Sequence, residues 1–161
     1  MERELTRLDD VRNIVDSLLK EITDEEMKRC AYVHLYGVGL MASLIALKRG
    51  HSREIAELAE IAGMLHDLLV YVDPSEDTED HAHKCADYAR DKVLKQLKAF
   101  TPEEADMIYS GIYNHSDKKT EGHWFDEIIK DADAAQHALR NPVEEYFFQK
   151  PRFQRVLDEF K

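Results

Sequence analysis

The stretch "AGMLHDLLVY" (residues 62–71) places a histidine and an aspartate, His66 and Asp67, inside a run that is otherwise almost entirely apolar. A buried carboxylate is costly to desolvate unless a cation or a hydrogen-bond donor meets it. A chain that places Asp67 there must therefore supply a partner for it elsewhere in the sequence.

Outward from this stretch, apolar residues recur at spacings of three and four, and the 161 residues include only four prolines and six glycines. This pattern predicts an all-α fold, a single-domain helical bundle of about six to eight helices. No repeat or linker divides the chain, so residues 1–161 are predicted to form one domain, with the motif-bearing core at about 23–140. The expected helices cover about residues 3–20, 23–49, 52–71, 81–99, 101–114 and 125–139, with short helical pieces near Pro142 and Pro151.

Two segments have the pattern of a helix start. "TDEE" (residues 23–26) and "TPEE" (residues 101–104) each place a threonine three residues before a glutamate. Such a pair forms a capping box, in which the hydroxyl and the carboxylate each accept a backbone N–H. Thr23 and Thr101 are therefore predicted to cap helices, and Pro102 suits the first helical turn.

The charge excludes one class of partner. With 33 acidic and 22 basic residues, the formal net charge of −11 argues against binding to a nucleic-acid duplex. An anionic substrate stays possible, because a bound metal can reverse the local field. No uninterrupted apolar stretch approaches about 18 residues and the amino terminus is charged, so we expect a cytoplasmic protein without a membrane partner. Cys30 and Cys85 lack metal-binding spacing and are predicted to be free thiols.

Metal-capable residues lie on or beside the apolar stripe of four predicted helices, namely His34, His66, His115 and Asp133. Imidazoles and carboxylates that converge inside an apolar bundle would repel or stay unsatisfied without a cation, and a divalent metal removes both penalties. Adjacent helical residues diverge by roughly 100°, so His66 and Asp67 can share an ion only at a seam between helices. The expected ligands are His34, His66, Asp67 and Asp133, with positions left open for water and substrate.

The order His34, His66-Asp67, Asp133 resembles that of the HD superfamily of metal-dependent phosphohydrolases. The local contexts "YVHLYGVGLMASLIA", "AELAEIAGMLHDLL" and "IIKDADAAQHAL" resemble the family's three motif helices. Two further segments, "HAHKCADYA" and "GIYNHSDK", resemble later histidine sites of a subset that binds extra ligands. On this resemblance His81 fits better than His83, and Asp133 better than Asp131, which would then be a supporting or capping group.

The resemblance implies a hydrolase that cleaves a phosphate ester or anhydride of a small substrate, a nucleotide, by attack of metal-bound hydroxide. Asp67 would be both ligand and proton acceptor. His81 and His115 would bind a second metal or, with a single ion, orient the phosphate or protonate the leaving oxygen; one tightly held ion is expected. "LLVY" follows the doublet where many members have glycine and lysine, so Lys118 or Lys119 is the candidate phosphate contact. The donor set suits Mn, Fe, Co, Ni or Zn, with Mg possible.

Two other classes of protein fit the same residues. The chain could be a catalytically inactive sensor or regulatory module that binds metal and nucleotide, or a purely structural bundle whose histidines are hydrogen-bonded core groups. A homodimer is compatible with the sequence. The aromatic residues Tyr36, Tyr71 and Tyr113 are interpreted as core, and the remaining histidines, His51, His83, His123 and His137, as surface or local packing groups. His137 lies one helical turn past Asp133, where it could support a ligand, but it is not counted among the site residues.

Overall fold

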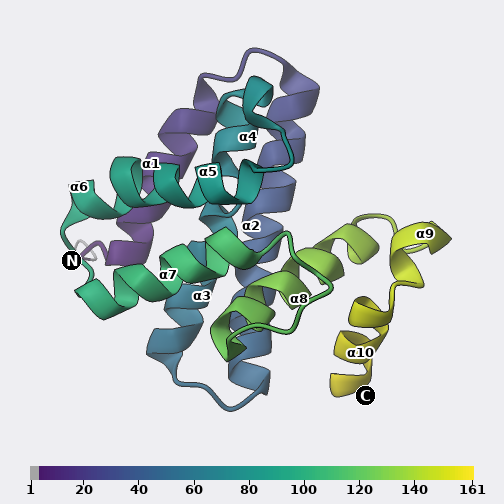
Figure 1. Cartoon of the computed structure of the whole chain (residues 1–161). Coiled ribbons are helices and arrows are strands. Elements are labelled where there is room, and N and C mark those ends of the chain that lie inside the picture. Colours follow the sequence, from purple (N-terminus) through teal and green to yellow (C-terminus); the bar gives the residue numbers. More distant parts are fainter. Residues whose placement is uncertain (1–3) are drawn as a thin grey trace.

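The computed structural model describes residues 4–161, which fold into an all-helical bundle, as predicted (Figure 1). A 3₁₀ turn at Pro74–Glu76 precedes α5, and a π-helical turn at Arg90–Leu94 joins α5 to α6. The helices are α1 (Arg7–Lys20), α2 (Glu25–Lys48), α3 (Arg53–Leu65), α4 (Leu68–Val72), α5 (His81–Ala89), α6 (Lys95–Leu97), α7 (Pro102–Asn114), α8 (Trp124–Arg140), α9 (Glu145–Phe148) and α10 (Pro151–Glu159).

Helix α2 is the centre of the bundle and packs against both α3 and α8. Helix α7 covers α3 and α8, and α5 lies along α7 (Figure 1). By length and composition α2 could cross a membrane, but the core helix of a soluble protein passes the same test. Its buried face, which includes Leu35, Val38 and Ala42, belongs to the main hydrophobic core.

The contact between α2 and α3 is unusually close because two glycines meet there. A Cβ atom on Gly63 would lie 2.7 Å from Cα and 2.8 Å from the backbone nitrogen of Gly39. The two backbones therefore touch, and no larger residue fits at position 63 without moving a helix. This close contact sets the distance between nearby side chains on the two helices, including His34 on α2 and His66 at the end of α3.

Two helix starts differ from the prediction. Helix α2 is capped by Asp24 rather than Thr23, and the Asp24 carboxylate accepts two backbone N–H groups, each at 2.9 Å. An anionic side chain at this position also interacts favourably with the helix dipole, which the neutral hydroxyl of Thr23 does not. Helix α1 begins at Arg7 behind a capping box formed by Thr6 and Asp9. The predicted start at residue 3 lies outside the described residues. The predicted capping box at Thr101 is confirmed.

The predicted helix over residues 52–71 is wrong, because the chain leaves the helical conformation at the doublet. Helix α3 ends at Leu65, Asp67 has φ −121° and ψ 14°, and α4 starts at Leu68. The cause is local: His66 Nδ1–H donates to the carbonyl oxygen of Gly63 at 2.7 Å and so satisfies a helix-end acceptor. Because Asp67 leaves the helical conformation while His66 keeps it, the two side chains are not forced about 100° apart.

The predicted helix over residues 81–99 begins at His81 but stops at Leu97. Lys98 adopts a left-handed conformation with φ 50°, which ends a helix and which residues other than glycine rarely adopt. The chain then turns into the cap of α7.

Helix α10 is attached to α8 by apolar contacts and by ion pairs. Phe153 and Val156 are buried in the core. Arg152 Nη1 donates to Glu127 and to Asp131, both at 2.7 Å. Burial by itself would raise the pKa of Glu127, but hydrogen bonds from Arg152, the Gly122 N–H and Lys130 lower the pKa from 4.5 to about 2.

This shift predicts an acid-dependent loss of stability. The folded protein holds Glu127 ionised, so the stabilisation is complete above about pH 4.5 and disappears as the pH falls towards about 2. We expect Glu127→Gln to lower the free energy of unfolding at pH 7 by on the order of 2 kcal/mol. Urea unfolding at several pH values measures this, and a gap between the two proteins that stays constant down to pH 2 would contradict the assignment.

Candidate metal centre

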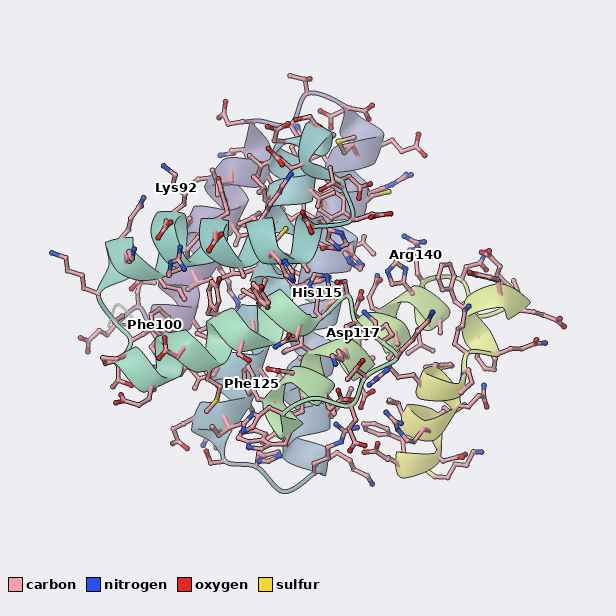
Figure 2. All side chains as sticks on the ribbon, in the orientation of Figure 1. Lys92, Phe100, His115, Asp117, Phe125 and Arg140 are labelled. Atoms are coloured by element: carbon pink, nitrogen blue, oxygen red, sulfur yellow. The ribbon has the colours of Figure 1, made fainter. Side chains whose placement is uncertain are left out.

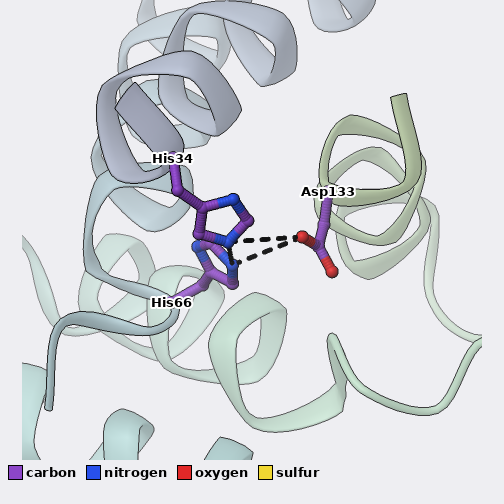
Figure 3. Close-up of side chains that lie close together, drawn as sticks. All are labelled: His34, His66 and Asp133. Carbon is purple, nitrogen blue, oxygen red and sulfur yellow. Dashed lines mark hydrogen bonds and ion pairs between the residues drawn. The ribbon is translucent and has the colours of Figure 1, made fainter. Parts of the chain in front are cut away.

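Three side chains from distant parts of the chain meet at the seam between α2, the end of α3 and α8. His34 Nε2 lies 3.2 Å from His66 Nε2, and each of these atoms lies 3.6 Å from Asp133 Oδ1. Figure 3 shows the two imidazoles and the carboxylate pointing towards one another from separate helices. His34, His66 and Asp133 are buried, and their ligand atoms are close enough to hold one metal ion.

Asp67 lies between this group and a second pair of histidines. Its Oδ2 is 3.4 Å from His34 Nε2 and 3.2 Å from His66 Nε2. Its Oδ1 is 3.2 Å from His115 Nε2 and 3.6 Å from His81 Nε2. The two carboxylate oxygens therefore face two different sets of imidazole nitrogens. His66, Asp67 and His115 form a second group that could hold an ion.

All four imidazoles are held in the same way, with Nδ1 bonded outward and Nε2 directed into the cluster. The Nδ1 contacts are His34 to Gln136 Oε1 (2.7 Å), His66 to Gly63 O (2.7 Å), His115 to Ile112 O (2.7 Å) and His81 to Thr78 O (2.9 Å). A proton on each Nδ1 leaves the Nε2 lone pair free to bind a metal.

The carboxylates at the centre are charged although they are buried. Burial by itself raises the pKa of Asp67, but His66, His115 and His34 hold it well below its usual range. Burial likewise opposes ionisation of Asp133, whereas Lys118, His137 and His66 lower its pKa. In return, the two carboxylates raise the pKa of His66 to about 10 against the effect of burial. The centre therefore needs positive charge among its imidazoles.

Two buried oxygen atoms test whether a cation fits. Within residues 4–161, Asp67 Oδ1 and Asp133 Oδ1 have no hydrogen-bond partner. Unsatisfied buried acceptors are costly, and a divalent ion would satisfy both and replace the proton that His66 otherwise carries. Imidazole nitrogen with carboxylate oxygen is a donor set typical of transition metals. The residues therefore fit a divalent metal ion.

The remaining candidates from the sequence divide into two groups. Lys118 lies at the cluster, where its Nζ donates to Asp133 Oδ2 at 2.6 Å and to the His115 carbonyl oxygen at 2.6 Å. Lys119 instead lines a separate cavity. His83 stacks on Tyr113 with ring centroids 3.8 Å apart, whereas His81 reaches Asp67.

Asp131 and Asp133 lie on different sides of α8. Asp133 is in the cluster, and Asp131 accepts hydrogen bonds from Arg49 at 2.6 Å and from Arg152. Asp131 is thus a structural anchor rather than a neighbour of the centre.

Figure 2 shows His115 in the interior of the bundle, close to α8.

Two residues at the centre were not among the predicted site residues. Gln136 fixes His34, and His137, one helical turn after Asp133, lies with Nε2 3.3 Å from Asp133 Oδ1. The signal was available, because positions 136 and 137 lie three and four residues after Asp133, on the same face of α8.

The cluster opens into a cavity of about 320 Å³. Tyr71, interpreted from the sequence as core, lies in its wall with its ring centroid 6.1 Å from that of His34. The lining residues are Met27, His34, Asp67, Val70, Tyr71, Pro74, Asp77, His81 and His137. A small molecule can therefore reach Asp67 and His81 from one side.

Comparison with known proteins agrees with this arrangement. A family model described as HD domain matches residues 31–138, more than half of the chain. That range contains every residue placed at the cluster above. No curated protein and no solved structure matches the chain.

Proposed function

The chain belongs to the HD domain family, whose members are metal-dependent phosphohydrolases, and on that premise we propose that it hydrolyses a phosphate ester or anhydride of a nucleotide. One observation carries the proposal: four imidazole Nε2 atoms converge on a half-buried carboxylate, Asp67, at 3.2–3.6 Å. In a purely structural core without a metal ion, Asp67 Oδ1 would be left without a hydrogen-bond partner.

We propose that His34, His66, Asp67 and Asp133 hold the first divalent ion. Such an ion lowers the pKa of bound water to about 7 and neutralises charge on phosphoryl oxygens. The sequence favours a single ion. The second face of Asp67, with His115 and His81, supports a second position next to the first, so we propose that the centre can hold two.

The protein's own groups can carry the proton transfers. Asp67 accepts a proton from the attacking water, because it is the carboxylate that faces both sets of imidazoles. If the centre holds a single ion, His81, which lines the cavity and keeps 24% of its side chain exposed, can carry a proton on Nε2 and give it to the leaving oxygen, whereas His115 is buried at 2% and positions Asp67. Lys118 uses two of its three N–H donors on Asp133 and the His115 carbonyl, and the third can contact a phosphoryl oxygen.

The cavity supports a substrate with a ring system attached to the phosphate. Tyr71 provides an aromatic wall, and Met27, Val70 and Pro74 make the rest of that side apolar. Aromatic and apolar walls with a few polar groups are typical of small-molecule sites. We also propose a cytoplasmic location without a membrane partner, and the net charge of −11 argues against a nucleic-acid duplex as partner. A homodimer is compatible with these features.

A panel of nucleotides and a generic phosphoester, each with added Mn²⁺, tests the proposal by phosphate release. We expect release from at least one nucleotide and its loss after chelation. Stabilisation by a nucleotide without release would favour the non-catalytic sensor. Purified protein without stoichiometric transition metal, and with a melting temperature unchanged by chelation, would favour the structural bundle. Metal analysis at one or two equivalents distinguishes one ion from two.

Gln136→Ala is expected to weaken metal binding without unfolding the protein. The variant removes the acceptor that holds His34 Nδ1–H at 2.7 Å, so the imidazole can rotate or change tautomer. Loss of such an orienting partner costs about 10–100-fold in metal affinity. Competition with a chromophoric chelator measures the change. Gln136→Glu keeps an acceptor oxygen and should retain most of the affinity; equal affinity in all three proteins would show that Gln136 has no positioning role.

A further inference from the structure

A second cavity, of about 720 Å³, lies between α8, α10 and the segment that follows α7. It shares only Lys118 with the metal cluster. Five of its nine lining residues are basic and three are acidic, in a chain whose net charge is −11. The lining residues are Arg49, Lys118, Lys119, Glu121, Glu127, Asp131, Pro151, Arg152 and Arg155. Positive charge is therefore concentrated at one place on an acidic protein.

Some of these basic side chains have few ion-pair partners within the described part of the chain. Arg49 and Arg152 are committed to carboxylates of α8 and α10, and they anchor the cavity walls. Arg155 is 58% exposed and makes one ion pair, at 3.2 Å, although a guanidinium has five N–H donors. Lys119 is exposed, and its ammonium has no carboxylate within 4.0 Å in the part of the chain described.

The amino-terminal end of α10 lies at the same cavity. Pro151 and Arg152 are its first residues and both line the cavity. The cap residue, Lys150, makes no side-chain hydrogen bond to the helix, so its first-turn N–H groups are not satisfied by a capping side chain. A helix amino terminus carries partial positive charge and favours anions. This adds to the charge of Lys119 and Arg155.

We propose that this cavity binds a compact anion that carries one or two phosphoryl groups, at a site separate from the metal centre. Arg155 and Lys119 contact the anion, because they have free donors, and Arg152 connects the site to the metal centre. Its Nη2 donates to the Lys118 carbonyl oxygen at 3.0 Å, and Lys118 Nζ donates to Asp133. Arg152, in the wall of the proposed anion site, is thus linked to a proposed metal ligand by two hydrogen bonds, one to each end of Lys118.

Calorimetric titration of the full chain with pyrophosphate, with a chelator present, tests the site without any contribution from a bound metal. We expect saturable binding of one pyrophosphate per chain. Lys119→Ala/Arg155→Ala should weaken it at least tenfold, whereas His34→Ala, which alters only the metal cluster, should leave it unchanged. Both mutated cavity residues are exposed, so the double variant is expected to fold; Lys119→Ala alone, with a smaller loss, serves if it does not.

Lys20→Ala/Arg53→Ala is the matched control, because it removes the same charge from exposed positions outside the cavity. Three results would overturn the proposal: no saturable binding up to about 10 mM pyrophosphate, an equal loss of affinity in the control variant, or loss of binding in His34→Ala. The last would place the anion at the metal cluster. All three outcomes are independent of whether the protein hydrolyses nucleotides.

Discussion

Asp67→Ala is expected to abolish metal retention and to lower phosphate release at least about 1000-fold. Both oxygens of this carboxylate face imidazole nitrogens at 3.2–3.6 Å, so its loss removes a ligand from each proposed ion position and the proton acceptor as well. The fold should survive, because the variant also removes the cost of burying a charge.

The stability of the variant gives a second measurement. In chelator, Asp67→Ala should melt at or above the temperature of the parent protein, yet added Mn²⁺ should stabilise only the parent. His51→Ala is the control, since His51 stacks on Trp124 with ring centroids 4.4 Å apart and lies outside the cluster. Asp67→Ala protein that keeps stoichiometric metal and full activity would show that the metal assignment is wrong.

Gly63→Ala should destabilise the protein more than alanine at any other glycine of the chain, because the added Cβ makes the shortest backbone contact. The new Cβ would lie within 2.7–2.9 Å of the backbone of Gly39 and Val38, and backbone atoms cannot rotate away. Overpacking of this kind costs roughly 3 kcal/mol, of which about 1 kcal/mol is recovered through the higher helix propensity of alanine. Because α2 and α3 must separate, His34 and His66 also move apart, and metal affinity should fall together with stability.

Gly122→Ala is the matched control. A Cβ there meets only side-chain atoms at 3.4–3.6 Å, an ordinary contact distance, so stability should change by less than about 0.5 kcal/mol. Chemical denaturation and chelator competition on both variants give the two quantities. If Gly63→Ala were as stable as the parent and bound metal normally, the close contact of α2 and α3 would not set the geometry of the centre.

The sequence predicted the all-helical fold and four members of the cluster, because both depend on spacing. His34, His66, His115 and Asp133 share a face with apolar residues, and that periodicity is visible in a single chain. The choice between neighbours such as Asp131 and Asp133 came from the family resemblance. Periodicity alone cannot make that choice, since both aspartates are buried and differ in their partners, arginines for Asp131, and imidazoles together with Lys118 for Asp133.

The features that the sequence did not predict depend on specific side-chain hydrogen bonds, some local and some between residues far apart in the chain. The helix break at His66 requires its imidazole to bond a backbone carbonyl, which the apolar pattern of residues 52–71 does not reveal. The cap at Asp24 was decided by competition between two adjacent polar side chains. Gln136 was missed because its role depends on His34, 102 residues away in the chain.

Three of the four histidines that face Asp67 take their orientation from a carbonyl oxygen three residues earlier in the chain: His66 from Gly63, His115 from Ile112 and His81 from Thr78. A backbone carbonyl is present whatever residue occupies that position, so substitutions at Gly63, Ile112 or Thr78 do not remove the acceptor that orients these three imidazoles. His34 differs, because its acceptor is the side chain of Gln136, and a substitution at position 136 can remove it.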